Sequence, residues 1–390
     1  MKVLFWLSAF VVIYTFVGYG IILYILVRIR RIIKGKKDYQ SMATSPLPSC
    51  SLIIAAYNEE SVIREKIRNT LDLNYPKDRL EIIFVTDGSS DRTPEIIAEF
   101  PGILLLHEKA RKGKIDAVHR AISRVQSEVM VFTDANTFLN KDALIHICRH
   151  YVDPTVGAVA GEKRVLSDKQ ADASSSGEGF YWKYESALKK WDSELYSVVG
   201  AAGELFSVRT SVYQPVGNDV ILDDFMISML IATKGFRIVY EPLAFAAETA
   251  SQNVSEELKR KIRIAAGGIQ SIIRLSPLLN IFNYGILSFQ YISHRVLRWT
   301  ITPFLLIAVF LLNVAMVFET GEPLYIGILA VQVLFYLLAG LGLLLEQKQL
   351  RVKALFVPYY FCVMNYAVLA GITRYFRKQQ SASWEKVRRK

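Results

Sequence analysis

Residues 51–59 read SLIIAAYNE, residues 80–91 read LEIIFVTDGSSD, and residues 129–136 read VMVFTDAN. Each stretch begins with a run of branched apolar residues, typical of a buried strand, and ends in residues that favour a turn. Helical patterns follow over residues 60–71, 94–99 and 114–123, and a further strand is expected over 102–106. This alternation predicts an α/β domain with a mostly parallel, doubly wound sheet.

The polar ends of these stretches lie where ligands bind in open α/β sheets, at the carboxyl ends of the strands. Tyr57, Asn58 and Glu59 follow the first strand, Asp87 to Asp91 follow the second, and Asp134 to Asn136 follow the fourth. A single motif of this kind is explained by turn formation or helix capping alone. Three of them in order, at successive strand ends, favour a ligand site.

The N-terminal segment predicts a membrane anchor. Residues 3–27 carry no charged side chain, and such a helix is long enough to cross a hydrocarbon core of about 30 Å. A cleaved signal peptide is the alternative, but the apolar run is too long and lacks a small-residue cleavage site. A basic cluster over residues 28–37 follows, so the positive-inside rule places the next domain in the cytosol.

Three further apolar runs, over residues 300–318, 324–345 and 354–373, predict C-terminal membrane spans. Three crossings would put the tail outside, whereas its basic charge favours the inside, so the parity of the tail stays open. The expected organisation is a transmembrane helix over 1–28, a basic linker over 29–48, a catalytic domain over 49–275, interfacial amphipathic helices over 276–299, transmembrane helices over 300–373 and a basic tail over 374–390.

The net charge of +11 comes from the two flanks of the membrane segments. Residues 28–37 and 374–390 hold 13 Lys and Arg and one acid, Glu385, so the remainder is nearly neutral. This distribution argues against a nucleic-acid partner and favours contact with the lipid bilayer. The cysteines Cys50, Cys148 and Cys362 have no metal-binding or redox spacing.

The ordered motifs resemble those of membrane-bound family-two glycosyltransferases of the GT-A fold, the cellulose synthase-like and hyaluronan synthase-like group. The resemblance covers residues 51–270 and rests on Tyr57-Asn58-Glu59, Asp87-Gly88-Ser89, Gly113-Lys114, Asp134-Ala135-Asn136, Gly200 to Gly203, Asp223-Asp224 and Trp384. It implies a cytosolic GT-A domain with an α-helical transmembrane region, in a multi-pass protein of a bacterial inner membrane. It also implies a nucleoside-diphosphate-sugar donor, with UDP-sugars expected.

The resemblance assigns donor binding to Ala56, Tyr57, Glu59, Asp87, Lys114, Asp134 and Arg263. Lys114 opens a helix, where backbone N–H groups favour an anion, although a solvated surface lysine is the alternative. Asp134 and Asn136 occupy the position of family ligands for Mg²⁺ or Mn²⁺. Since Asn136 replaces a second acid there, we expect weaker metal binding.

The resemblance makes Asp223 and Asp224 catalytic and aligns Asp224 with the family's general base. Paired acids at a helix start are often only caps, but they also raise one another's pKa, which suits a base near neutral pH. In-line attack by the deprotonated acceptor would invert the anomeric centre.

The acceptor site of the family lies near residues that correspond here to Tyr181, Trp182, Gly203 and Glu204, although aromatic residues on a helix are more often core. Residues 259–270 stand where processive synthases carry Gln-x-x-Arg-Trp, and that motif is not reproduced. Residues 293–299 are expected at headgroup depth, with His294 as an interfacial residue.

Three functions follow as hypotheses. The leading one is inverting transfer to a growing polysaccharide or oligosaccharide, with a homo-oligomer or an export partner favoured because three C-terminal spans form only a small channel. The second is transfer to a lipid acceptor such as polyprenol phosphate, diacylglycerol or a ceramide-like molecule. The third is a catalytically weak scaffold in an export complex, suggested by Asn136 and the missing tryptophan.

Overall fold

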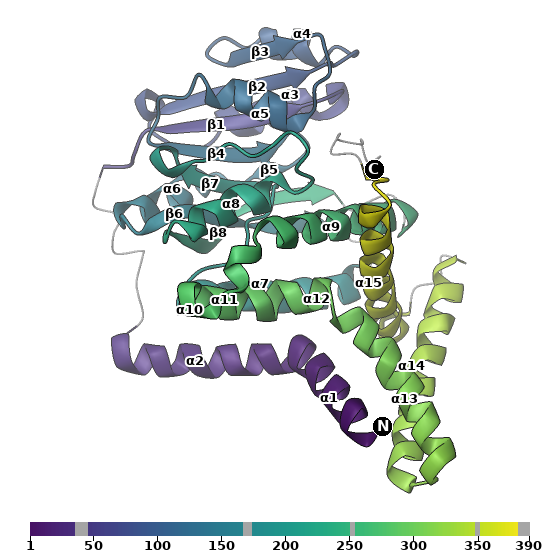
Figure 1. The fold of residues 1–390 in the computed structure, drawn as a ribbon. Coiled ribbons are helices and arrows are strands. Elements are labelled where there is room, and N and C mark those ends of the chain that lie inside the picture. The colour runs from purple at the N-terminus through teal and green to yellow at the C-terminus, as the bar shows by residue number, and fades with distance from the viewer. Residues whose placement is uncertain (36–45, 167–173, 250–253, 348–351, 381–390) are drawn as a thin grey trace.

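The computed structural model describes residues 1–35, 46–166, 174–249, 254–347 and 352–380. Trp384, named among the motifs above, lies outside these residues. In Figure 1 the sheet occupies the upper part of the molecule, α7, α9 and α11 lie beneath it, and α1, α13 and α14 extend away from it.

The sheet has eight strands in the order β3-β2-β1-β4-β7-β6-β8-β5. The bounds are β1 Cys50–Ala56, β2 Leu80–Asp87, β3 Leu104–Glu108, β4 Val129–Asp134, β5 Phe138–Leu139, β6 Val156–Leu166, β7 Leu205–Arg209 and β8 Arg237–Thr249. The first four in this order pair in parallel, as the alternating pattern predicted. Beyond them β7 runs antiparallel to both β4 and β6, so the second half of the sheet is mixed.

Helices cover both faces of the sheet, and each face has its own core. They are α3 Glu60–Leu71, α4 Thr93–Ala98, α5 Lys114–Ile122, α6 Ala143–Cys148, α7 Ser174–Leu195, α8 Asp223–Thr233 and α9 Val254–Arg274. In β1, Leu52 and Ile54 join one apolar cluster while Ile53 and Ala55 join the other. Burial on both faces explains why this strand is continuously apolar instead of alternating.

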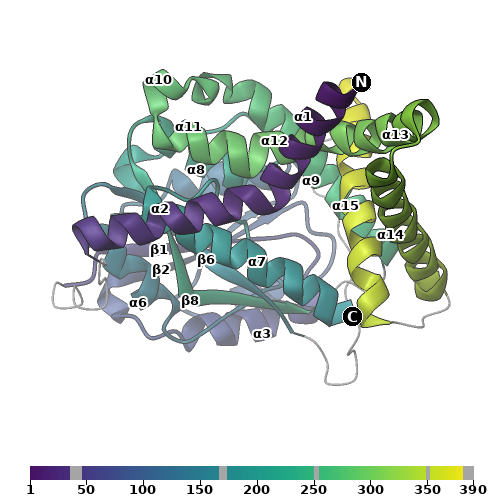
Figure 2. The same cartoon turned by 90° about the horizontal axis from the view of Figure 1, so that it is seen from below.

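The N-terminal helix, which the sequence predicted as one membrane span, is bent. It consists of α1 Lys2–Ile13, a π-helical turn over Tyr14–Gly18 and α2 Tyr19–Lys34. Such turns are a recognised cause of kinks, and Figure 2 shows α2 running along the underside of the domain beside α7. Tyr19, Leu23 and Val27 are buried on one side of α2, whereas isoleucines on the other side are exposed.

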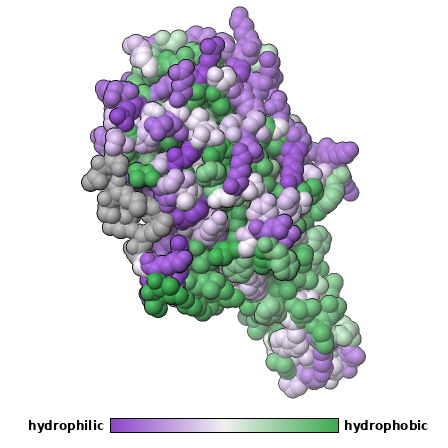
Figure 3. All heavy atoms as spheres, turned by 60° about the vertical axis from the view of Figure 1, so that its left-hand side comes forward, coloured by the Kyte–Doolittle hydropathy of each residue, from purple (hydrophilic) through white to green (hydrophobic). Residues whose placement is uncertain are grey.

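The C-terminal part contains the three predicted apolar helices, α13 Thr302–Thr320, α14 Pro323–Gln347 and α15 Lys353–Phe376, after the short helices α10 Ile281–Tyr284, α11 Ile286–Tyr291 and α12 Leu297–Trp299. Among the described residues, four helices are long and apolar enough to cross a membrane, the bent N-terminal helix and these three. The protruding end of the molecule is largely hydrophobic, whereas the sheet end is mainly hydrophilic (Figure 3). The chain is therefore a multi-pass membrane protein with its α/β domain in the cytosol.

An ion pair fixes the far end of the membrane region. The Lys2 ammonium lies 2.5 Å from the Glu322 carboxylate, in the loop between α13 and α14. The N-terminus and this loop thus lie on the same side, which agrees with the orientation expected from the basic residues after the first span.

Candidate active site

The carboxyl ends of β1 and β4 open onto a cavity of about 310 Å³. Its lining includes ten of the predicted site residues, namely Tyr57, Glu59, Lys114, Asp134, Asn136, Gly203, Glu204, Asp223, Asp224 and Arg263. Ala56 and Asp87 line a smaller adjoining pocket, which shares Tyr57 and Lys114 with the first. The side chains of Tyr181 and Trp182, on α7, lie outside those described. Motifs more than a hundred residues apart in sequence thus meet at one site.

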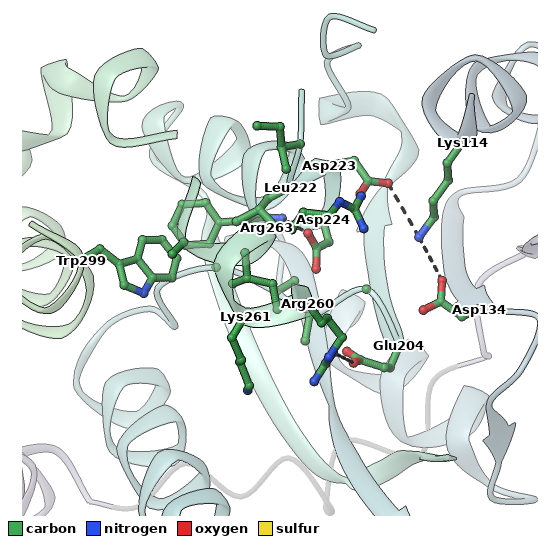
Figure 4. Close-up of a pocket in the computed structure, with 18 of the residues that line it drawn as sticks. Lys114, Asp134, Glu204, Leu222, Asp223, Asp224, Arg260, Lys261, Arg263 and Trp299 are labelled. Atoms are coloured by element: carbon green, nitrogen blue, oxygen red, sulfur yellow. Dashed lines mark hydrogen bonds and ion pairs between the residues drawn. The ribbon is translucent and has the colours of Figure 1, made fainter. Parts of the chain in front are cut away.

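Lys114 links the acidic residues that come from two different motifs. Its ammonium is 2.9 Å from an Asp134 carboxylate oxygen and 4.0 Å from one of Asp223 (Figure 4). Burial alone would lower the pKa of Lys114, but these carboxylates hold it above its ordinary value. Lys114 is therefore a fixed positive charge inside the cavity, not a solvated surface lysine.

Asp223 and Asp224 open α8 and face the cavity. Burial, and then the negative charge of Asp223, raise the pKa of Asp224 to about 7, while Lys114 opposes this shift. Gly203 lies close to the Asp224 carboxylate. A Cβ added to this glycine would be only 3.3 Å from Asp224 Oδ2. The site thus contains, in Asp224, a carboxyl group that exchanges a proton near neutral pH.

Asp87 organises the turn that precedes Lys114. Its carboxylate accepts hydrogen bonds from the backbone N–H of Lys112, at 3.0 Å, and of Gly113, at 2.6 Å, and lies 3.3 Å from the Arg120 guanidinium. Gly113 has a φ of +105°, a backbone conformation that glycine adopts without strain. Asp87 therefore fixes the turn from which Lys114 extends into the cavity.

The first two motifs are also joined to each other. The Asn58 side-chain oxygen accepts a hydrogen bond from the backbone N–H of Ser90 at 2.8 Å, and Asn58 itself has a φ of +53°. The guanidinium of Arg111 stacks 4.0 Å from the centre of the Tyr57 ring. Tyr57 and Arg111 both line the smaller pocket, and the Asn58–Ser90 contact joins the two motifs beside it.

Lys66 is a buried residue that the sequence motifs did not reveal. Its side chain is 0% exposed and donates hydrogen bonds to the carbonyl oxygen of Thr137 at 2.6 Å and to the hydroxyl of Thr133 at 3.3 Å. Burial lowers its pKa to about 7. Through these two hydrogen bonds, Lys66 holds the turn that carries Asp134. The available signal was periodicity, since Lys66 lies on the same face of α3 as Ile63 and Thr70, three to four residues apart.

The helix α9 closes the cavity and fixes the chain ahead of Asp223. The Gln270 side chain accepts a hydrogen bond from Ile221 N–H and donates to the carbonyl of Asp219, both at 2.9 Å. Within the described part of the chain, no hydrogen bond or ion pair engages Arg263, which lines the same cavity. Its guanidinium is therefore available to a negatively charged ligand.

Glu204 is held by cations on both sides. Lys163 lies 2.6 Å from its carboxylate and Arg260 lies 3.9 Å from it. Although burial opposes this, these cations hold the pKa of Glu204 below its ordinary range. Glu204 is accordingly an ionised residue that fixes the wall of the cavity.

The prediction that His294 is an interfacial residue is wrong. His294 is 1% exposed, and its ring lies 2.6 Å from Asp192 and 3.3 Å from Glu185, both on α7. The basic and aromatic residues around His294 are typical of a segment at the depth of the lipid head groups. In the structure, however, the buried carboxylate of Glu185 on α7 neutralises Arg295 and Arg298. The segment is therefore packed against the domain.

Trp299, from the same segment, lines the catalytic cavity. It packs on α9 so closely that a Cβ on Gly268 would lie 2.5 Å from the indole, and the Arg295 guanidinium lies 5.5 Å from its ring. The last helix also reaches this wall, where Met364, Ala367 and Val368 of α15 line the cavity. The cavity thus has a polar end at the strands and an aromatic and apolar end at the membrane helices.

A divalent cation fits the polar end of this cavity. Asp134 and Asn136 supply oxygen donors of the kind that Mg²⁺ and Mn²⁺ prefer. Among the described residues there is no group of three or more His, Cys, Asp or Glu that could hold a metal ion alone. The residues therefore suit a cation that shares its coordination with a phosphate ligand and water.

Comparison with known proteins agrees with this architecture. The chain is 29% identical over 275 residues to a poly-beta-1,6-N-acetyl-D-glucosamine synthase of Staphylococcus aureus (strain COL), a match that covers 68% of this chain and 64% of the synthase. It is 27% identical to the probable glycosyltransferase YdaM of Bacillus subtilis (strain 168), over 58% of this chain and 57% of that protein. The chain thus spans less than two thirds of the length of these curated relatives.

A mannosyltransferase of Pyrobaculum calidifontis, solved in complex with GDP-Man and Mn²⁺, superposes with a TM-score of 0.67 at 22% identity, over 96% of this chain and 100% of that one. This likeness shows a shared fold. Residues 51–216 match the family model described as glycosyl transferase family 2. Together with the motifs at the strand ends, these findings identify residues 51–216 as a glycosyltransferase family 2 domain with a GT-A fold.

Proposed function

We propose that the chain transfers a sugar, with inversion, from a nucleoside-diphosphate sugar to a polysaccharide or oligosaccharide at the membrane, and that UDP-sugars are its donors. The observation that carries this proposal is the placement of Asp224, with its pKa near 7, in one cavity with the Lys114–Asp134 pair. A proton acceptor and a site for a leaving diphosphate are what this reaction needs.

In the proposed reaction Asp224 takes the proton of the acceptor hydroxyl. The freed oxygen attacks the anomeric carbon from the face opposite the diphosphate, and the bond from that carbon to the phosphate oxygen breaks. The electron pair of this bond leaves with the diphosphate. A single in-line displacement gives a β-linkage from an α-linked donor and needs no carboxylate nucleophile. Asp223 keeps the pKa of Asp224 high enough for a base that works near neutral pH.

The leaving diphosphate requires positive charge, which we assign to Lys114 and Arg263. A bound Mg²⁺ or Mn²⁺, held by Asp134 and Asn136, would neutralise further charge on the phosphates. We assign the nucleoside to the smaller pocket, where Ala56, Tyr57 and the turn organised by Asp87 meet. Glu59 borders the donor on the side of the main cavity.

We place the acceptor at the other end of the cavity, between Gly203 and Glu204 on one side and Trp299 on the other. The likeness to a poly-beta-1,6-N-acetyl-D-glucosamine synthase favours a carbohydrate acceptor. One observation favours a lipid acceptor instead, since the apolar side chains of α15 border this end of the cavity. Product analysis separates the two alternatives.

The test is donor turnover by the detergent-purified full chain. We expect nucleoside diphosphate release from one of a panel of UDP-sugars, in the presence of Mg²⁺ or Mn²⁺ and not with EDTA, and a β-anomer in the product by NMR. A ladder of oligosaccharides would support the polysaccharide function, and a single glycolipid the lipid alternative. A retained anomer contradicts inversion. No release from any UDP-sugar or GDP-mannose, even with lipids and oligosaccharides added, would favour the scaffold.

Replacing Trp299 with alanine is expected to raise the acceptor KM about tenfold, because an aromatic face that stacks on a sugar ring is lost. Trp299→Phe keeps a ring and should recover most of the affinity. Initial rates at varied acceptor and fixed donor measure this change. The donor KM is the control. If the donor KM also rises tenfold, the replacement damages the whole cavity, and Trp299 has no specific role in binding the acceptor.

A further inference from the structure

Lys189, on α7, is a buried cation that no step of the proposed reaction uses. It is 6% exposed and lines the catalytic cavity. Within the described part of the chain, no hydrogen bond or ion pair engages its side chain, and its ammonium lies 5.9 Å from the centre of the Tyr240 ring. Taking a cation out of water is costly unless oxygen atoms replace its lost hydration.

The other deeply buried basic residues differ from Lys189 in this respect. Among the described residues, six Lys and Arg are less than a tenth exposed. Five of the six have an oxygen partner, namely Lys66 in the Thr137 carbonyl, Arg149 in Glu241, Lys163 in Glu204, Arg237 in the Tyr196 carbonyl and Lys261 in Glu257. Lys189 is the exception among them, and it borders an open cavity. We therefore expect a ligand of this cavity to supply the missing oxygen.

Lys189 belongs to the end of the cavity at which we place the acceptor. Glu185 precedes it by four residues, about one helical turn, and lines the same cavity. The Glu185 carboxylate lies 2.9 Å from the Arg295 guanidinium, which in turn lies 5.5 Å from the Trp299 ring. Figure 4 shows Trp299 and Lys114, which we assign to the donor, on opposite sides of the site. One turn of α7 thus adds an ammonium group to the side of the cavity that carries the aromatic wall.

The charge around Lys189 favours a neutral ligand over an anionic one. Tyr240 donates its hydroxyl to the Glu162 carboxylate, and the Ser186 hydroxyl donates to the same carboxylate at 2.7 Å. Both donors are uncharged, so this carboxylate is left to balance the ammonium charge at longer range. Hydroxyl and carbonyl oxygens satisfy an ammonium group without adding a second negative charge. A sugar ring, apolar on its faces and polar at its edge, fits an aromatic face together with such a donor.

We propose that Lys189 binds the carbohydrate acceptor, donating hydrogen bonds to hydroxyl or carbonyl oxygens of the sugar unit whose ring packs on Trp299. This inference rests on the proposed transfer to a carbohydrate and adds to it a residue that determines acceptor specificity. An acyl or prenyl chain at this end of the cavity would leave the ammonium without an oxygen partner.

The test compares Lys189→Met with Lys190→Met. Methionine keeps most of the side-chain volume but has no donor. Lys190 is the matched control, because it is the next residue of α7, is exposed and does not line the catalytic cavity. The acceptor is the β-linked oligosaccharide of glucose, mannose or N-acetylglucosamine that the detergent-purified wild-type chain extends best. The acceptor KM at saturating donor, the donor affinity by equilibrium binding and the Tm are measured for each chain.

We expect Lys189→Met to raise the acceptor KM about tenfold or more, the loss typical of one hydrogen bond to a charged group. Its donor affinity should be unchanged, and its Tm should equal or exceed that of the wild type, because the variant no longer buries a cation without an ion pair. Lys190→Met should leave all three quantities unchanged.

Two results for Lys189→Met would overturn this role and leave the proposed function intact. One is an acceptor KM within twofold of the wild-type value. The other is a fall in Tm together with weaker donor binding, which would make Lys189 a structural residue. If the wild type extends none of these oligosaccharides, or forms only a glycolipid, the carbohydrate acceptor itself is excluded, and the role of Lys189 with it.

Discussion

Asp224→Asn is expected to lower kcat by on the order of 10²- to 10⁴-fold, the contribution typical of a general base. Asparagine keeps the size and the polar contacts of the side chain but cannot accept the proton of the acceptor. Donor binding should be nearly unchanged, because Asp224 is not among the groups we assign to the diphosphate. The measurement is nucleoside diphosphate release at saturating donor and acceptor, together with donor affinity by equilibrium binding.

The pH dependence gives an independent check on Asp224. Its pKa is raised to about 7, and only the ionised form accepts a proton, so kcat/KM should rise with pH and level off above about 7. Asp223→Asn removes the neighbouring negative charge that helps to raise this pKa, so its profile should shift to lower pH. Retention of more than about a tenth of the activity by Asp224→Asn would exclude Asp224 as the base.

The parallel half of the sheet could be predicted because local signals there agree with one another. Branched apolar runs such as residues 82–85 end in Asp-Gly or Asp-Ala turns, and amphipathic helices follow. The antiparallel half could not be predicted in the same way. β5 has two residues, and β6 and β8 pair with a register shift near Gly161, so their position depends on tertiary contacts that leave little trace in a local pattern.

The same distinction applies to the site. Residues at strand ends could be expected to meet, since parallel strands present their carboxyl ends at one edge. Lys66 and Trp299 were missed because each reaches the cavity region from a helix whose orientation no strand motif specifies. The role of Asp87 in fixing the Lys112–Gly113 turn could not be predicted either, since its partners in that turn are backbone N–H groups, which no side-chain motif reveals.

The bend of the N-terminal helix shows what hydropathy does not encode. A run of uncharged residues satisfies the length criterion for a span whether or not the helix stays straight. The second half of the run is amphipathic, and its buried face, with Tyr19 and Leu23, packs on Leu188 of α7. Packing on the domain, and not hydrophobicity alone, therefore sets the direction of α2.

Lys114→Met is expected to lower kcat/KM by on the order of 10²-fold, the cost typical of losing one charged group that stabilises a leaving anion. Methionine fills a similar volume without the charge. A second effect should accompany the first. The ammonium of Lys114 opposes the rise in the pKa of Asp224, so its removal should move the midpoint of the pH profile of kcat/KM to higher pH.

Lys112→Met is the matched control for Lys114→Met, because it removes a lysine from the same segment whose exposed side chain does not line the cavity. Only the backbone N–H of Lys112 contacts Asp87, and this group is kept in the variant. We expect wild-type rates and an unchanged midpoint. If Lys114→Met merely damages the turn, the rate should fall while the midpoint of the pH profile stays the same. That result would contradict a direct electrostatic role of Lys114. A loss together with an upward shift is what a positive charge acting between the diphosphate and the base requires.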